Sequence, residues 1–227
     1  MIYAVIAAGG IGSRMGAVKP KQYIEIGGSP IIKHTAEKFA SNSRIDKVII
    51  LVPEDWVEYT QSIFNSDDVK VICGGDTRNE TLMRAIDYIE ETDGLNDETY
   101  LVTHDAVRPF VTEKIIDDNI EAMLRYGATG TVIPATDTIF QSSNGETIDS
   151  IPDRSFLYQA QTPQCFKALE LRQLYMSLTD EEKDILTDGC KIYLLKGHEI
   201  HLVKGDVSNI KITYPHDLIV AEAILKA

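Results

Sequence analysis

A glycine-rich segment with two nearby cations follows the first apolar run of the chain. Gly9, Gly10 and Gly12 allow the backbone to curl tightly and to direct its N–H groups at phosphate oxygens. Arg14 and Lys21 come next, and two cations beside such a loop are unfavourable to leave unpaired in an acidic protein. The segment therefore indicates a phosphate-binding loop rather than a simple strand-to-helix connection.

Two common phosphate loops do not match this segment. A Walker A loop ends in Gly-Lys-Ser/Thr, whereas Ser13 follows Gly12 here. A dinucleotide-binding loop needs glycine three residues after Gly12, where Met15 stands. It also needs an acidic residue at the end of the second strand, where Val52 and Pro53 stand. The sequence therefore disfavours binding of NAD.

A second glycine pair precedes an expected helix. Gly74 and Gly75 are followed by Asp76, Thr77 and Arg78. The free N–H groups and the dipole of a helix start favour anions and polar edges, which would make this a ligand site. Alternatively, Asp76 or Thr77 caps the helix, and the motif by itself favours the cap.

A carboxylate follows the fourth expected strand. Asp105 stands at the carboxyl end of that strand, where ligands bind in open α/β sheets. Magnesium typically takes one or two carboxylates together with substrate phosphates, so Asp105 is a candidate Mg²⁺ ligand. The structural alternative is that Asp105 pairs with Arg108.

Composition limits the classes of protein that this chain can be. The 227 residues include 22 Lys and Arg against 35 Asp and Glu, a net charge of −13 that disfavours binding to nucleic acid or to an acidic membrane. No apolar run approaches the roughly 18 residues of a membrane span, and the first run does not resemble a signal peptide, so we expect a cytoplasmic protein. Three cysteines without a CxxC pair indicate buried thiols rather than disulfides or zinc ligands.

Short apolar runs alternate with amphipathic segments along the chain. This alternation predicts an α/β fold with a mostly parallel sheet covered by helices. Strands are expected at 2–7, 47–52, 69–73, 100–103, 131–134 and 199–203. Helices are expected at 31–39, 54–64, 78–91, 113–125 and 217–225, the last opened by Pro215. Because no repeat or linker interrupts the series, we expect one domain over residues 1–227.

Residues 135–155 depart from this alternation. Thr and Ile flank the segment around Asn144 and Gly145, and Asn-Gly is a strong signal for a hairpin turn. The sequence predicts a projecting β-hairpin arm. Because an isolated hairpin is only marginally stable, we expect the arm to pack against a second copy of the chain.

Taken in order along the chain, these motifs resemble the cytidylyltransferases that activate sugar-alcohol phosphates. The matching segments are AGGIGSRM (8–15), PKQ (20–22), GGDTR (74–78), HDAVRP (104–109), DTI (137–139), QTPQ (161–164) and NIKIT (209–213). The resemblance covers nearly the whole chain.

Two branches of this group are similar to the chain. The D-ribitol-5-phosphate cytidylyltransferases of teichoic-acid synthesis are favoured by GGIG (9–12), Val107, Tyr158-Gln159 and LTDGCKI (186–192). The 2-C-methyl-D-erythritol 4-phosphate cytidylyltransferases of isoprenoid synthesis are favoured by Ala7-Ala8 and by the short spacing from Arg14 to Lys21. We take D-ribitol 5-phosphate as the expected acceptor and 2-C-methyl-D-erythritol 4-phosphate as the alternative.

The resemblance implies a Rossmann-like fold, a homodimer joined through the arm, and Mg²⁺-dependent transfer of CMP from CTP with release of pyrophosphate. It assigns charge neutralisation on the α- and β-phosphates to Arg14 and Lys21, and the magnesium ion to Asp105. It assigns the acceptor phosphate to Lys211 and to Arg154 from the partner's arm, and the acceptor hydroxyls to Thr138 and Thr162. The residues implied in nucleotide binding are Ala7, Ala8, Gly9, Gly10, Gly12, Gly75, Asp76, Arg78, Thr81, Asp105, Ala106 and Arg108.

A non-catalytic nucleotide-binding protein with the same fold is the alternative from another class. Such a protein would keep the glycines and lose the catalytic cations. Arg14, Lys21, Arg154 and Lys211 are all present, which favours an enzyme.

Overall fold

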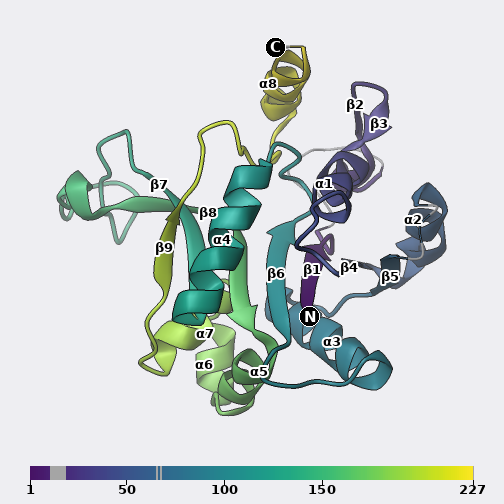
Figure 1. The fold of residues 1–227 in the computed structure, drawn as a ribbon. Coiled ribbons are helices and arrows are strands. Elements are labelled where there is room, and N and C mark those ends of the chain that lie inside the picture. The colour runs from purple at the N-terminus through teal and green to yellow at the C-terminus, as the bar shows by residue number, and fades with distance from the viewer. Residues whose placement is uncertain (11–18, 65, 67, 227) are drawn as a thin grey trace.

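In the described part of the chain, seven strands form the central sheet, and helices cover both of its faces (Figure 1). The computed structural model describes residues 1–10, 19–64, 66 and 68–226. Across the sheet the strands follow the order β5-β4-β1-β6-β8-β7-β9. Their bounds are Ile2–Ala7 (β1), Lys47–Val52 (β4), Val69–Cys73 (β5), Tyr100–Asp105 (β6), Ala128–Pro134 (β7), Tyr158–Lys167 (β8) and His201–Lys204 (β9).

The strand directions confirm the predicted, mostly parallel α/β sheet. β1 pairs in parallel with β4 and β6, β4 pairs in parallel with β5, and β7 pairs in parallel with β9. Among the described strands of this sheet, only β8 is antiparallel to its neighbours, and it lies between β6 and β7. In the register of β1 and β6, Ala7 lies opposite Asp105. The first glycine-rich segment therefore starts beside the predicted metal ligand.

The predicted helices are present, with small shifts at their ends. The predicted helix 54–64 is divided into a 3-10 turn, η3 (Glu54–Trp56), and a short helix, α2 (Val57–Ile63). The other helices are α1 (Ile31–Ala40), α3 (Arg78–Thr92), α4 (Glu113–Tyr126), α5 (Ala168–Met176), α6 (Asp180–Asp184), α7 (Gly189–Leu195) and α8 (Pro215–Leu225). Helices α5 to α7 were not predicted, because such short segments show little periodicity. None of the helices described combines the length and the apolar character needed to cross a membrane.

Strand β8 is the main element that the sequence analysis missed. Residues 159–164 are mostly amides and hydroxyls, so they lack the apolar pattern that identifies a strand. In the sheet, its backbone carbonyls accept hydrogen bonds from buried side chains of other strands. Thr103 Oγ1 donates to Gln164 O at 2.8 Å, and Thr131 Oγ1 donates to Pro163 O at 2.6 Å. These partners come from distant parts of the chain, which is why the local sequence does not reveal the strand.

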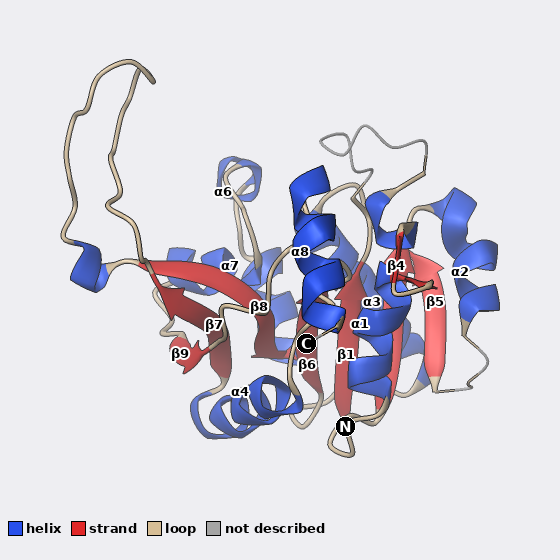
Figure 2. Ribbon diagram, turned by 90° about the horizontal axis from the view of Figure 1, so that it is seen from above, coloured by secondary structure: helices blue, strands red, loops and turns tan. Residues whose placement is uncertain are grey.

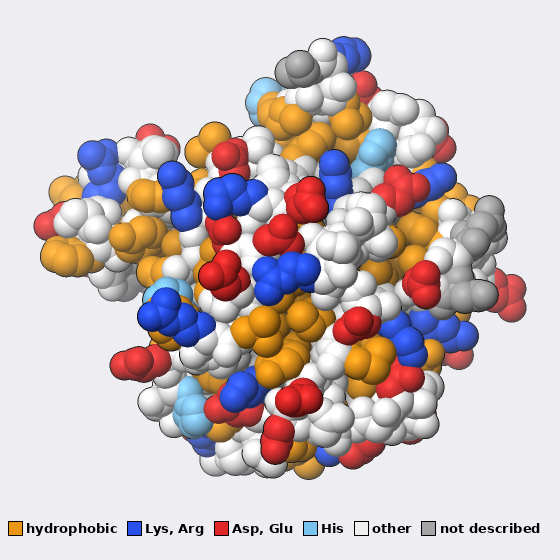
Figure 3. All heavy atoms as spheres, viewed as in Figure 1, with side chains coloured by type: hydrophobic (Ala, Val, Ile, Leu, Met, Phe, Trp, Pro, Cys, Tyr) orange, Lys and Arg blue, Asp and Glu red, His pale blue; other side chains and the backbone are white. Residues whose placement is uncertain are grey.

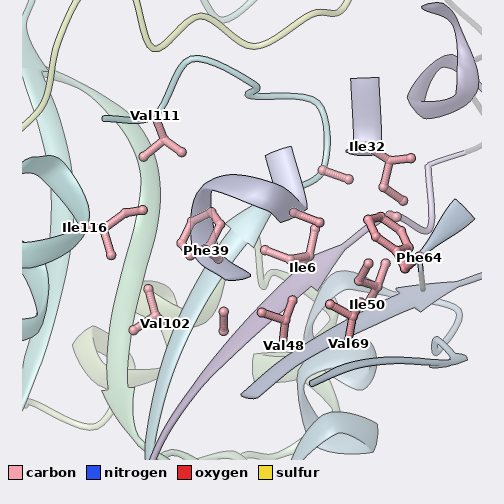
Figure 4. Packing of buried hydrophobic residues seen from close by; sticks show 14 of the residues in the cluster. Ile6, Ile32, Phe39, Val48, Ile50, Phe64, Val69, Val102, Val111 and Ile116 are labelled. Atoms are coloured by element: carbon pink, nitrogen blue, oxygen red, sulfur yellow. The ribbon is translucent and has the colours of Figure 1, made fainter. Parts of the chain in front are cut away.

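Alternate residues of the strands pack into two apolar clusters, one on each face of the sheet. Ala4 and Ile6 of β1 face the cluster under α1, α2 and α4, which Figure 4 shows around Ile6 and Phe39. Tyr3 and Val5 face the opposite cluster, under α3, α5 and α7. Because both faces of the sheet are covered, β1 and β4 are apolar at nearly every position, as the continuous runs in the sequence predict.

Core packing leads to a stability prediction with a matched control. Ile86 of α3 has no exposed surface, and its replacement by alanine should lower the free energy of unfolding by about 2–5 kcal/mol. Ile219 of α8 is 69% exposed, and the same replacement there should change stability by less than about 0.5 kcal/mol. Urea denaturation of both variants checks this. Equal losses would contradict the burial of Ile86 in the core.

Residues 135–155 project from the body of the molecule as an arm (Figures 1 and 2). The predicted turn is present at Gly145, whose φ is +74°. The predicted two-stranded ladder is not: within the arm, β-pairing is limited to one bridge between Gln141 and Ser150. Near the tip, backbone N–H groups donate to a side chain instead of to a partner strand: Asn144 Oδ1 accepts from the N–H groups of Glu146 and Thr147 at 2.9 and 3.0 Å. The local polar residues thus favour a looped arm over a regular hairpin.

Apolar side chains reach the surface along the arm and its base. Figure 3 shows them at the left of the molecule, next to basic side chains. The most exposed ones are Phe140, Ile148, Ile151, Phe156 and Tyr158. Exposed apolar groups gathered on a projecting segment are typical of an interaction surface.

Candidate active site

A cavity of about 340 Å³ opens where β1 and β6 end, a volume within the usual range for small-molecule sites. Its wall also includes the residues that lead into α3, the 3-10 turn η2 (Lys21–Tyr23) and the loop before α8. The described residues that line it are Ala7, Ala8, Gly9, Gly10, Lys21, Gln22, Gly75, Asp76, Thr77, Arg78, Thr81, Asp105, Ala106, Val107 and Lys211.

Most of the predicted nucleotide-binding residues lie on this wall. They are Ala7, Ala8, Gly9, Gly10, Gly75, Asp76, Arg78, Thr81, Asp105 and Ala106. The predicted cations Lys21 and Lys211 lie on it as well, and Gln22, Thr77 and Val107 join them without having been predicted. Gly12 and Arg14 lie outside the described residues.

A smaller cavity of about 160 Å³ adjoins the first. The predicted residues Arg108 and Thr162 line this second cavity and not the first. Arg78, Asp105 and Lys211 line both, so these three charged residues stand on the border between the two cavities. Thr187 and Asp188, just before α7, complete part of its wall.

Two predicted acceptor residues lie on the arm, away from these walls. Thr138 and Arg154 are exposed, and neither is among the described residues that line the two cavities. Arg154 Nη1 donates to Thr136 O of the same arm at 2.6 Å. Within one chain, therefore, the structure does not bring Arg154 and Lys211 to the same cavity.

Asp105 is a buried carboxylate surrounded by three cations. Its Oδ1 accepts from Arg78, and its Oδ2 lies 2.9 Å from Lys211 Nζ and 3.4 Å from Arg108 Nε. The expected pairing with Arg108 thus exists, but it is the longest of the three contacts. Burial by itself raises the pKa of the Asp105 carboxyl. The charges of Arg78, Lys211 and Arg108 outweigh burial and hold that pKa below its usual range, so Asp105 is ionised.

Lys21 is held in the wall by its neighbours in η2. Its side chain is largely buried, and Nζ donates to Ile212 O at 3.0 Å. Gln22 Nε2 donates to Ala8 O at 2.6 Å, and the Tyr23 ring stacks on Trp56 with centroids 4.4 Å apart. The turn is therefore anchored on both sides, and its lysine is fixed at the cavity.

The start of α3 is a capped helix, as the sequence favoured. Thr77 Oγ1 accepts from Glu80 N at 3.1 Å, and Glu80 Oε2 accepts from the N–H groups of Asp76 and Thr77. The carboxylate of Glu80 thus already occupies these donors. Gly75 is required here because a Cβ on it would lie 2.5 Å from the Cβ of Glu80.

Arg108 ties the smaller cavity to the loop that bears Lys211. It is buried; its Nη1 donates to Asn209 O at 2.9 Å, and its Nη2 donates to Ala160 O at 3.4 Å. Asn209 Nδ2 in turn donates to Thr162 O at 2.9 Å. Sequence reasoning quoted Asn209 only as part of a motif and assigned it no role. Its position two residues before the predicted acceptor-phosphate lysine, Lys211, is the signal in the sequence that could have identified it.

His104 was also given no role by the sequence analysis. It has no exposed surface, and burial lowers its pKa to about 3, so its ring is neutral. Its two ring nitrogens contact Thr162 and the backbone of Arg108. The three cysteines are all free, as expected; Cys165 is buried, whereas Cys73 and Cys190 are partly exposed.

Comparison with known proteins gives consistent matches along the chain. The family model described as 2-C-methyl-D-erythritol 4-phosphate cytidylyltransferase (IspD) matches residues 2–227. A solved 4-diphosphocytidyl-2C-methyl-D-erythritol synthase is 28% identical with a TM-score of 0.82, over 99% of both chains. The synthase from Anaerococcus prevotii DSM 20548 is 25% identical with a TM-score of 0.82, over 100% of this chain and 96% of its own. The Francisella tularensis 2-C-methyl-D-erythritol 4-phosphate cytidylyltransferase is 26% identical with a TM-score of 0.81, over 98% of both chains.

Proposed function

Because this chain belongs to the 2-C-methyl-D-erythritol 4-phosphate cytidylyltransferase family, we propose that it transfers CMP from CTP to 2-C-methyl-D-erythritol 4-phosphate. The chain is a cytidylyltransferase, and its substrates are CTP and a sugar phosphate. The acceptor proposed here is the alternative of the sequence analysis, which preferred D-ribitol 5-phosphate. The change follows the family model and the similar structures, whose names specify the erythritol acceptor or its cytidylyl product.

The border between the two cavities is the observation that supports this proposal. The larger cavity has a volume in the range of small-molecule sites, and the smaller one is lined by Arg78, Arg108 and Lys211, which suit a phosphorylated acceptor. Arg78, Asp105 and Lys211 line both cavities. Two phosphates that meet at this border bring several negative charges to the place where Arg78 and Lys211 stand. These cations favour the close approach of the two phosphates.

The reaction needs positioning and charge neutralisation more than it needs an acid or a base. An oxygen of the acceptor phosphate, already ionised, attacks the α-phosphorus of CTP. The bond from this phosphorus to its bridging oxygen breaks, and the electron pair leaves with pyrophosphate. Lys21, from the wall of the larger cavity, stabilises charge that develops on the α- and β-phosphates, and Lys211 orients the incoming acceptor phosphate.

The carboxylates on the cavity wall are ligands of the type that magnesium prefers. Asp76 and Asp105 both line the larger cavity, and Mg²⁺ commonly takes one or two carboxylates with substrate phosphates. Among the described residues, no group of three or more His, Cys, Asp or Glu forms a dedicated metal cluster, so substrate oxygens would complete the site. Bound beside Asp105, Mg²⁺ would neutralise part of the triphosphate charge.

Removal of the metal tests this part of the proposal. We expect chelation with excess EDTA to abolish pyrophosphate release, because the triphosphate charge would then be left to the protein cations alone. Addition of Mg²⁺ beyond the chelator should restore it. Undiminished turnover in EDTA would show that the reaction needs no divalent cation.

D-ribitol 5-phosphate is the second candidate acceptor, and one observation favours it. The segment LTDGCKI (186–192) resembles the ribitol branch, and its residues Thr187 and Asp188 line the smaller cavity. That cavity is where the acceptor would bind. The segment that carries the ribitol resemblance therefore stands where it could affect the choice of acceptor.

A side-by-side assay decides between the two acceptors. Pyrophosphate release is measured with CTP and Mg²⁺ in the presence of 2-C-methyl-D-erythritol 4-phosphate or D-ribitol 5-phosphate. A higher kcat/KM with 2-C-methyl-D-erythritol 4-phosphate supports the main proposal. A higher kcat/KM with D-ribitol 5-phosphate contradicts it and supports the second candidate. Release with neither acceptor, for a folded protein that binds CTP, contradicts both.

The arm supports the proposal that the enzyme works as a homodimer. It projects from the body (Figure 2). It also exposes apolar side chains, and its Arg154 lines neither cavity of its own chain. In a dimer joined through the arms, Arg154 reaches the acceptor phosphate in the partner's site, and Thr138 approaches the acceptor hydroxyls.

The variant Arg154→Ala tests the shared site. It should raise the KM for the acceptor by about 10-fold or more and leave the KM for CTP nearly unchanged, because a phosphate contact is lost. Mixing it with Lys21→Ala should restore activity at about a quarter of the sites, since a mixed dimer has one intact site. Absence of rescue, with mixed dimers demonstrated, would place Arg154 in its own subunit's site.

A further inference from the structure

His104 occupies a buried position directly beneath the charge cluster. It is the residue before Asp105 at the end of β6, and its ring lies 4.9 Å from that of Phe39. Nδ1 is 2.9 Å from Thr162 Oγ1, and Nε2 is 3.1 Å from Arg108 O. Both ring nitrogens therefore have a partner, on two different segments of the chain.

The direction of each hydrogen bond follows from the Arg108 carbonyl, which can only accept. Nε2 of the neutral ring therefore carries the proton and donates to Arg108 O, and Nδ1 accepts. Thr162 Oγ1 donates its proton to Nδ1 and itself accepts from the backbone N–H of Asp105 at 3.2 Å. Asp105 N–H, the Thr162 hydroxyl, the His104 ring and Arg108 O thus form one consistent series of hydrogen bonds.

This series of hydrogen bonds spans the turn from Asp105 to Arg108. Arg108 N donates to Asp105 O at 3.1 Å across the turn, and Ala106 N donates to Ala7 O at 3.0 Å. The ring of His104 holds the far end of the turn through Arg108 O, and it holds the near end through Thr162. The side chains at both ends of the turn, Asp105 and Arg108, belong to the charge cluster.

We propose that His104 is a positioning residue of the active site, which acts through Thr162 and the Arg108 carbonyl to fix Asp105 at the border of the two cavities and Arg108 in the wall of the smaller one. The inference rests on the proposed function. The inference also restricts the role that the resemblance gives to Thr162. Its hydroxyl proton is committed to His104, so its oxygen can only accept a hydrogen bond from a hydroxyl of the substrate.

Three substitutions separate the two bonds. His104→Phe keeps the ring shape and removes both bonds; kcat should fall by about 10-fold or more, with little change in the KM for CTP. His104→Asn places an amide oxygen near Nδ1 and restores the bond to Thr162, whereas His104→Gln places an amide nitrogen near Nε2 and restores the bond to Arg108 O. Each should recover part of the lost kcat. His216→Phe, at an exposed position of α8, is the matched control.

A double-mutant cycle distinguishes positioning through Thr162 from simple core packing. If His104 acts through Thr162, the losses in kcat caused by His104→Phe and Thr162→Val should not add, because both remove the same link. Additive losses in kcat would contradict the proposed action of His104 through Thr162. Equal kcat for folded His104→Phe and for the wild type would overturn the whole inference.

A measurement on the wild-type enzyme does not depend on activity. Nitrogen NMR of the His104 ring should show a protonated Nε2 and an unprotonated Nδ1. The opposite tautomer would contradict the hydrogen bonds that link Thr162, His104 and Arg108 O. This result also decides the inference if His104→Phe does not fold. If the wild type releases no pyrophosphate with any acceptor, the proposed function fails, while the ring tautomer still reports on the hydrogen-bond chain.

Discussion

Replacement of Lys21 by alanine should lower kcat by on the order of 100-fold or more, as expected when a charge that acts on the transition state is deleted. The lysine is largely buried in the cavity wall, where its ammonium interacts more strongly with phosphate than it would in water. Its hydrogen bond to Ile212 O and the anchored turn η2 hold it in place before substrate binds. Steady-state pyrophosphate release at saturating CTP and acceptor measures the effect.

Lys19→Ala is the matched control for this variant. Lys19 lies two residues earlier and is exposed, so its removal should change kcat by less than about 2-fold. Lys21→Ala with kcat close to that of the wild type would reject the role of Lys21 in catalysis. A rise in the KM for CTP with unchanged kcat would instead assign Lys21 to ground-state binding.

Replacement of Asp105 by asparagine is expected to produce the second large loss, on the order of 100-fold in kcat/KM. The carboxylate is buried and is the common partner of Arg78, Arg108 and Lys211. The amide keeps the shape but removes the negative charge, so the cations repel one another and the proposed magnesium ligand is lost. Kinetics with varied CTP, acceptor and Mg²⁺ measure the loss.

Folding must be measured beside activity for this variant, because the loss of a buried counter-charge also destabilises the protein. Circular dichroism at the assay temperature separates the two effects. Asp118→Asn is the control: Asp118 pairs with Lys114 on the surface of α4 at 2.7 Å, and its loss should change kcat/KM by less than about 2-fold. Wild-type kcat/KM in Asp105→Asn would show that the charge cluster does not contribute to the reaction.

Sequence patterns were sufficient wherever the relevant signal was local. The bounds of β1, β4 and β5 agree with the predicted strands, because these short runs rich in apolar residues end shortly before glycine or proline. The glycine segments and Asp105 could be assigned to one end of the sheet, because parallel strands bring their carboxyl ends to the same edge. The α/β class and most of the residues that line the larger cavity were thus predictable.

Only the tertiary structure decided which charges meet and what holds them. Arg78 and Lys211 are far from Asp105 in the sequence, yet both contact its carboxylate. Strand β8, with its polar residues, places Thr162 beside His104, and the loop before α8 places Asn209 beneath Arg108. The pattern of residue types along a segment indicates the burial of its side chains and the secondary structure that it prefers. The partner of a buried polar group is set by long-range packing, because that group must find its hydrogen bond wherever the folded chain provides one.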